Sequence, residues 1–176
     1  MQTRFDKQDR LYQVIRLIRP VHLNIQRTLE AQLDGTGISV AQRDVMEVLH
    51  GCGPITVPTA TRMLGMKRQF VQRTMTDLIE LGMVERRRSS RQSRAYLCKL
   101  TEQGERLFET VHQREMALLR QRLGDINITE VIVALRVMAR VAAAYEAAAA
   151  DTLTMSTIAK LPDHKAALDA ADSSAV

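Results

Sequence analysis

The stretch GMKRQFVQRTMTDLIELG, residues 65–82, is the sequence feature that most constrains the fold. On a helix of about 3.6 residues per turn its apolar side chains share one face. These are Val71, Met75, Leu78 and Ile79. The opposite face carries Gln69, Gln72, Arg73 and Thr76, with Lys67 and Arg68 at the N-terminal end. Such polar side chains can donate to base edges and phosphates, but a solvated surface helix shows the same pattern. The neighbouring sequence is needed to distinguish a DNA-reading helix from a solvated one.

Two shorter helical patterns precede this stretch. Ser39 and Gln42 have the spacing of a capping box, and the helix that they start has an apolar face. Thr56 can cap a second helix that ends at Gly65, and Ile55 just before it predicts a very short strand. A short helix, a turn and an amphipathic helix form a helix-turn-helix, whose second helix enters the major groove of DNA.

A basic hairpin is predicted directly after the helix-turn-helix. Residues 83–88 and 94–100 form two short extended runs, and a polar loop, 89–93, joins them. The arginines gathered there are Arg86, Arg87, Arg88, Arg91 and Arg94. Charged residues also protect an exposed sheet edge, but behind a helix-turn-helix such a hairpin is positioned to reach phosphates or the minor groove.

Long helical patterns flank this DNA-reading segment. One runs from 6 to 33 with a kink expected at Pro20, one follows Thr101 to about 123 with an apolar side, and one runs from Thr129 to an alanine-rich end near 150. The apolar side after Thr101 consists of Leu107, Val111, Leu118 and Leu119. These helices have little to pack on except each other, which favours an intertwined homodimer.

The fold class predicted from these patterns is mainly α with a minor β component. We expect a helical dimerisation region in residues 1–37 and 102–150 and a winged helix-turn-helix in residues 38–101. Residues 151–176 are expected to form a tail that is partly helical or disordered.

Composition limits the classes of function. The net charge of +5 and the isoelectric point of about 9.6 favour an anionic partner. No phosphate-binding glycine loop, metalloprotease motif or nucleophile elbow is present, and the four histidines are scattered, so we expect no enzyme, no cofactor and no metal site. No apolar segment predicts a membrane span or a secretion signal, so a cytoplasmic protein is expected.

With these residues described, the chain resembles the MarR family of bacterial transcriptional regulators from about residue 10 to 150. The resemblance rests on ISVAQRDVMEVL, GPITV, LGMKRQFVQRTMTDLIELGMVERR and RAYLCKLTEQGERL, in this order. It implies a homodimer with one winged helix-turn-helix in each subunit. It also implies binding to pseudo-palindromic double-stranded operators, and in many members release by a small, often aromatic acidic or phenolic effector.

The resemblance also assigns residues by position. The recognition helix begins near Lys67, and Arg68, Gln69, Gln72 and Arg73 are its implied base and phosphate contacts. Arg94 matches the wing arginine of the family. Lys67 stands where the family commonly has serine, and Gln92 stands where it has an acid that orients the wing arginine. The predicted DNA contacts are therefore Lys67, Arg68, Gln69, Gln72, Arg73, Thr76, Arg88, Arg91 and Arg94.

The sequence leaves two alternatives to a ligand-released repressor. One is a winged-helix module that binds other proteins and no longer reads DNA sequence. The other is a redox-sensing regulator that uses Cys52, in a Gly-Pro turn, or Cys98, in the second wing strand. Small hydrophobic roles for both cysteines are the simpler interpretation.

Overall fold

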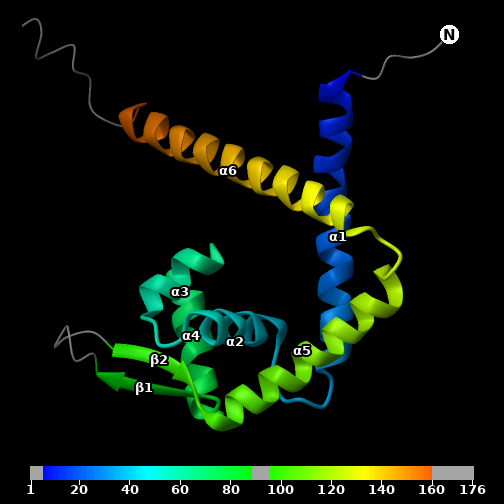
Figure 1. Cartoon of the computed structure of the whole chain (residues 1–176). Helices are drawn as coiled ribbons and strands as arrows, with labels where there is room; N and C mark the ends of the chain where they lie inside the picture. Colours follow the sequence, from blue (N-terminus) through cyan, green and yellow to red (C-terminus); the bar gives the residue numbers. More distant parts are fainter. Residues whose placement is uncertain (1–5, 89–95, 160–176) are drawn as a thin grey trace, which may run out of the picture. The chain divides into compact units, whose positions relative to one another are not determined.

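Helices dominate the described part of the chain, residues 6–88 and 96–159, in this computed structural model (Figure 1). The elements are α1 (Lys7–Leu33), α2 (Val40–Cys52), α3 (Val57–Leu64), α4 (Arg68–Glu80), β1 (Val84–Arg88), β2 (Tyr96–Leu100), α5 (Glu102–Leu123) and α6 (Ile128–Ala159). The two strands pair antiparallel. The predicted class, mainly α with a β-hairpin wing behind a helix-turn-helix, is confirmed. Two compact units, residues 1–122 and 123–176, divide the chain.

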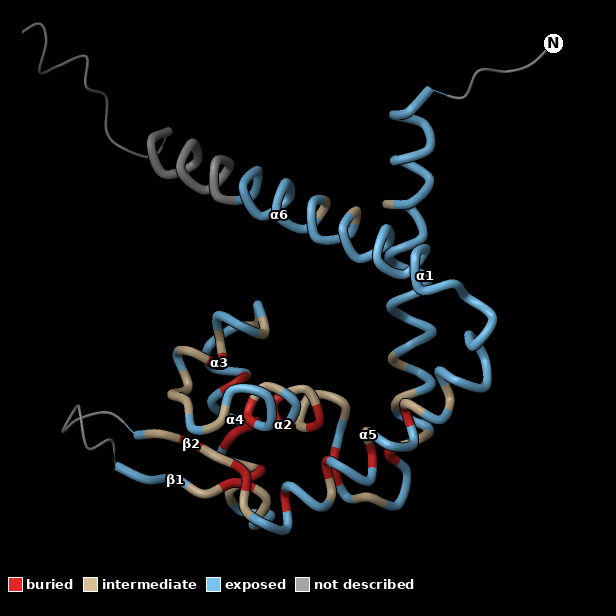
Figure 2. Tube along the Cα trace, in the orientation of Figure 1, coloured by how far each residue is buried: buried red, intermediate tan, exposed pale blue. Residues whose placement is uncertain are grey.

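The buried core lies in the first unit, where α2, α3, α4, the hairpin and the first half of α5 meet (Figure 2). Its fully buried side chains are mostly aliphatic: Val45, Met46, Leu49, Ala60, Val71, Met75, Leu78 and Val111. The spacing of Val45, Met46 and Leu49 on α2 follows the helical period, as expected. This core fixes how α4 is rotated about its axis.

The helix caps predicted at Ser39 and Thr56 are confirmed. The Ser39 hydroxyl accepts from the Gln42 amide, and the Ser39 amide donates to the Gln42 side chain at 2.8 Å, which completes the capping box. The Thr56 hydroxyl accepts from the Thr59 amide at the start of α3. Ile55, predicted as a very short strand, forms a single β-bridge with Cys98. That bridge attaches the loop before α3 to the hairpin.

The hairpin is anchored to α5 by a close backbone approach. The Thr101 hydroxyl donates to the Gly82 carbonyl at 2.7 Å and accepts from the Gly104 amide, so it also caps α5. A Cβ atom at Gly104 would lie 2.1 Å from the Met83 carbonyl oxygen. Only glycine therefore allows α5 to pack this closely on the start of the wing.

A buried ion pair joins α2 to α5. The Arg43 guanidinium donates to both carboxylate oxygens of Glu115, through Nε at 2.8 Å and through a terminal nitrogen. Both side chains are less than a tenth exposed, and Glu47 and Asp44 also contact Arg43. Burial raises the pKa of the Asp44 carboxyl, against the opposing effect of Arg43. The pair fixes α5 against the helix-turn-helix.

The flanking helices α5 and α6 add detail to the sequence prediction, and only the expected end of the last helix near Ala150 differs from the structure. The buried residues of α5 are Gly104, Phe108, Val111 and Glu115, whereas Leu119 is exposed and Leu107 and Leu118 are only half-buried. The helix α6 continues past the expected end near Ala150 to Ala159, because no glycine or proline interrupts it before Pro162. No helix of the described residues is both long and apolar enough to span a membrane.

Candidate nucleic-acid interface

The core determines which side chains of α4 face solvent. Val71, Met75 and Leu78 are at most 1% exposed and hold one side of the helix on the core. The polar residues predicted for the other side are all exposed: Lys67, Arg68, Gln69, Gln72, Arg73 and Thr76. The predicted amphipathic arrangement of this helix is therefore confirmed. It leaves a polar surface free for a partner.

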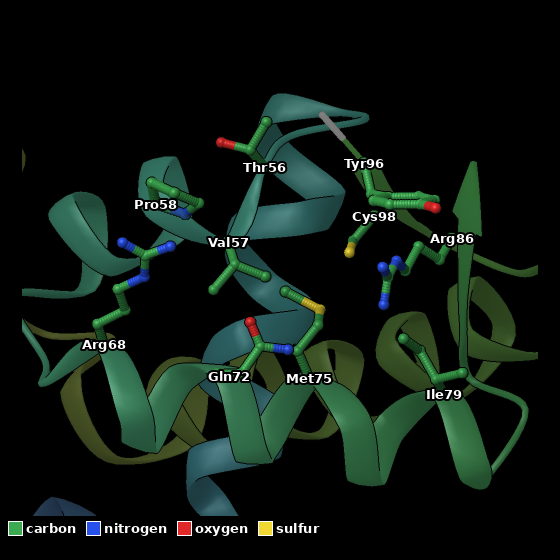
Figure 3. Close-up of a pocket in the computed structure, with 10 residues that line it drawn as sticks. All are labelled: Thr56, Val57, Pro58, Arg68, Gln72, Met75, Ile79, Arg86, Tyr96 and Cys98. Atoms are coloured by element: carbon green, nitrogen blue, oxygen red, sulfur yellow. The ribbon is translucent and has the colours of Figure 1, made fainter. Parts of the chain in front are cut away.

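The exposed residues of α4 fall into two stripes with different surroundings. Arg68, Gln72, Met75 and Ile79 line the hollow between α4, the start of α3 and the hairpin, with Arg68 on the side of Pro58 (Figure 3). Gln69, Arg73 and Thr76 lie about a quarter turn further around the helix, at roughly 100° per residue. The Thr76 hydroxyl donates to the Gln72 carbonyl at 3.0 Å, so toward a partner it offers only its methyl group and a lone pair.

The N-terminus of α4 has no side-chain cap. Lys67 occupies the cap position and makes no capping hydrogen bond, and the first turn contains no acidic residue. The first amide N–H groups therefore have no side-chain acceptor, and the helix dipole adds positive potential there. Together with the Lys67 and Arg68 side chains, this end of α4 favours an anion such as a phosphate.

A hollow of about 450 Å³ separates α4 from the hairpin (Figure 3). Its wall is formed by the start of α3, one stripe of α4 and one face of the hairpin. The lining residues are Thr56, Val57, Pro58, Arg68, Gln72, Met75, Ile79, Arg86, Tyr96 and Cys98. Two guanidinium groups, one from the helix and one from the wing, thus border a partly apolar recess.

One face of the hairpin changes from apolar to cationic along its length. Val84 pairs with Leu100 and both are buried, whereas Arg88 pairs with Tyr96 nearer the tip. The guanidinium carbon of Arg86 lies 3.8 Å from the centroid of the Tyr96 ring, and that of Arg88 lies 6.0 Å from it. A cation held over an aromatic face is restricted in orientation. Tyr96, which the sequence analysis missed, therefore positions Arg86 beside the hollow.

The opposite face of the hairpin is neutralised in part. Glu85 contacts Lys99 at 2.9 Å and Arg87 at 3.0 Å. The hydrogen bond from Lys99 lowers the pKa of the Glu85 carboxyl. Arg88, a predicted DNA contact, is exposed and makes no ion pair with the residues that the structure describes. Arg91 and Arg94 lie outside the described residues.

The two cysteines have different surroundings. Cys52 is exposed at the end of α2, with its sulfur 3.8 Å from that of Met63. Cys98 is 2% exposed, and burial raises the pKa of its thiol although Arg86 acts in the opposite direction. Within residues 6–88 and 96–149, no three metal-ligating side chains of the His, Cys, Asp or Glu type come together.

Known proteins resemble this chain in sequence and in fold. A family profile described as MarR family matches residues 36–95. The uncharacterized protein Rv2011c of Mycobacterium tuberculosis is 38% identical over 71 residues, which are 40% of this chain and 49% of that protein. This chain therefore spans about half the length of the curated relative.

Solved structures of transcription regulators cover more of the chain. The MarR family transcription regulator SP03579 superimposes with a TM-score of 0.72 at 27% identity, over 81% of this chain and 95% of that one. A mutant of MarR from E. coli, solved in complex with operator DNA, superimposes with a TM-score of 0.65 at 25% identity, over 77% of this chain and 98% of that one.

Proposed function

Since the chain belongs to the MarR family, we propose that it is a dimeric transcriptional repressor that reads a pseudo-palindromic operator and is released by a small ligand. The observation that carries this proposal is the surface of α4. Its core-facing side is fixed, and its solvent-facing side presents two amides and two guanidinium groups beside a basic wing. Side chains of these types supply bidentate contacts to guanine and adenine in the major groove.

The proposed contacts divide into two kinds. Gln69 and Arg73 point outward from α4 and are the proposed readers of base edges, and Gln72 is proposed to read bases from the stripe beside the wing. We propose that Lys67, Arg68, Arg88, Arg91 and the wing arginine Arg94 bind phosphates and the minor groove. Phosphate contacts supply affinity that falls with salt, whereas base contacts supply discrimination.

Dimerisation through residues 1–37 and 102–150 is proposed from exposed apolar side chains. Along α1 they are Leu11, Val14, Leu17, Ile18, Val21, Leu23 and Ile25. Along α6 they are Ile128, Val131, Ile132, Val133, Leu135 and Met138. A single chain would leave these two helices with large apolar surfaces in water. A second copy would cover them and would set two α4 helices about one DNA turn, roughly 34 Å, apart.

Release by a ligand requires that the ligand bind one state of the protein better than the other. The hollow between α4 and the hairpin has room for a small molecule, and Arg68 and Arg86 border it. An aromatic acid there could place its carboxylate on Arg86 and on Arg68, and we assign Arg68 to the DNA interface. We therefore propose that such an effector competes with DNA at this hollow.

Selection of genomic DNA with the purified protein at near-physiological salt tests the proposal. A footprint over an inverted repeat, with half-site centres about ten base pairs apart, is expected. The variant Lys67→Ala, which removes a proposed phosphate contact, should weaken operator and random DNA alike. Salt-dependent binding without any sequence preference, from a folded dimer, would instead favour the protein-interaction module.

A further inference from the structure

Phe70 is an aromatic residue on the first turn of α4 that is only partly covered by the chain. Its side chain is 48% exposed, whereas Val71 and Thr74 on the same helix are buried. The chain has only three phenylalanines, and Phe108 is 3% exposed in the core. Transfer of a large apolar ring out of water is favourable, so an exposed ring on this helix indicates contact with a binding partner.

The chain covers only about half of Phe70. The core-facing position next to it is filled by Thr74, whose hydroxyl donates to the Phe70 carbonyl at 2.9 Å. Among the described residues the ring stacks on no other aromatic side chain. Tyr96, the other exposed aromatic residue of the winged helix-turn-helix, is by contrast covered by Arg86.

The position of Phe70 around the helix places it beside the proposed base readers. At roughly 100° per residue, the stripe of Arg68 that faces the hollow is followed by Gln69, then Arg73 and then Phe70. Phe70 also precedes Arg73 by three residues, so their side chains are neighbours on the helix surface. The ring is thus the apolar border of a polar surface, on the side away from the wing.

The major groove of DNA offers one apolar group to such a ring, the C5-methyl group of thymine. The other groups exposed there are hydrogen-bond donors and acceptors, which the neighbouring amide and guanidinium side chains can match. We propose that Phe70 reads the methyl group of a thymine next to a base contacted by Gln69 or Arg73. This inference rests on the proposed function, since it requires that α4 enter the major groove.

Replacement of thymine by deoxyuridine tests the contact, because it removes only the methyl group. Each thymine of a footprinted operator half-site is replaced in turn, and the Kd of each DNA is measured by fluorescence anisotropy. At one position the wild-type protein should lose about four-fold in affinity, the amount expected for one buried methyl group. Phe70→Ala should bind the two DNAs equally well.

Two further variants keep the test decisive. Phe70→Gln also lacks the ring but retains a long side chain suited to a helix, so it should lose the preference for thymine as well. Met63→Ala removes another exposed apolar side chain, 52% exposed on α3, and should keep the wild-type preference. Circular dichroism of each variant establishes that it is folded.

The outcomes separate this inference from the proposed function. If no thymine is sensitive to loss of its methyl group, or if Phe70→Ala and Phe70→Gln keep the same sensitivity, the assignment of Phe70 is wrong while operator binding stands. If the wild-type protein shows no sequence preference for any DNA, the proposed function itself fails. Retained operator binding together with loss of a protein partner in Phe70→Ala would assign the ring to that partner instead.

Discussion

Removal of the Glu115 side chain should strongly destabilise the fold, because it breaks the buried ion pair with Arg43. Glu115→Ala leaves the Arg43 guanidinium buried, with both hydrogen bonds to the carboxylate gone. A buried charge that loses its partner is not rehydrated, because the surrounding core keeps water out. The expected effect is therefore a loss of stability, not merely a loss of one contact.

The magnitude follows from what Arg43 retains. Breaking a buried ion pair by removing one partner typically costs about 3–5 kcal/mol. Glu47, which is half exposed, and Asp44 at 3.5 Å still offset part of the positive charge. We therefore expect Glu115→Ala to lower the free energy of unfolding by about 3 kcal/mol, near the lower end of that range.

Urea unfolding followed by far-UV circular dichroism measures this loss. The protein concentration is held constant, because dissociation of a dimer would make the midpoint depend on it. Glu109→Ala, on an exposed position of the same helix, is the matched control and should stay within about 0.5 kcal/mol of the wild-type protein.

A double replacement distinguishes an unpaired charge from lost packing. Arg43→Met combined with Glu115→Leu replaces both charges by apolar groups of similar length, and it should recover most of the stability that Glu115→Ala loses. An unpaired buried charge is excluded as the cause if Glu115→Ala costs less than about 1 kcal/mol, or if the double variant is as unstable as the single one.

Three other predictions follow from single features of the structure. Arg73→Ala should reduce the preference for operator over random DNA by about 1–3 kcal/mol, measured as a ratio of Kd values; equal losses on both DNAs would remove it from base reading. Gly104→Ala should destabilise the fold by about 1–3 kcal/mol because its Cβ atom meets backbone, whereas Gly51→Ala, with open space around it, should be neutral or stabilising in thermal unfolding. At neutral pH, alkylation followed by mass spectrometry should modify Cys52 far faster than Cys98. Rapid labelling of native Cys98 would contradict its burial. Since burial raises the pKa of the Cys98 thiol, the contribution of this thiol to the free energy of unfolding is complete below the usual thiol pKa and is lost as the pH rises through the folded value.

Local signals in the sequence were sufficient for the helix-turn-helix. The capping box at Ser39, the cap at Thr56 and the apolar period of α4 each depend on residues within a few positions of one another. Such patterns determine where a helix starts and which face it buries. The exposure of the predicted α4 contacts followed directly from that period.

Long-range contacts could not be predicted in the same way. Arg43 and Glu115 are far apart in the sequence, and each alone looks like an ordinary surface charge on a helix. The stacking of Arg86 on Tyr96 depends on the strand register, which the sequence leaves open across the wing loop. The burial of Phe108 was not predicted either, because it depends on the packing of α2 against that side of α5.

The aromatic content of the chain gives the wing its own optical signal. There is no tryptophan, and the three tyrosines are Tyr12 on α1, Tyr96 on β2 and Tyr145 on α6. Tyrosine emission is therefore not masked, and in a protein carrying Tyr12→Phe and Tyr145→Phe it would come from the wing alone. Because Arg86 lies over the Tyr96 ring, any displacement of that guanidinium by a nucleic acid or an effector would change the emission, without a dye attached to either molecule.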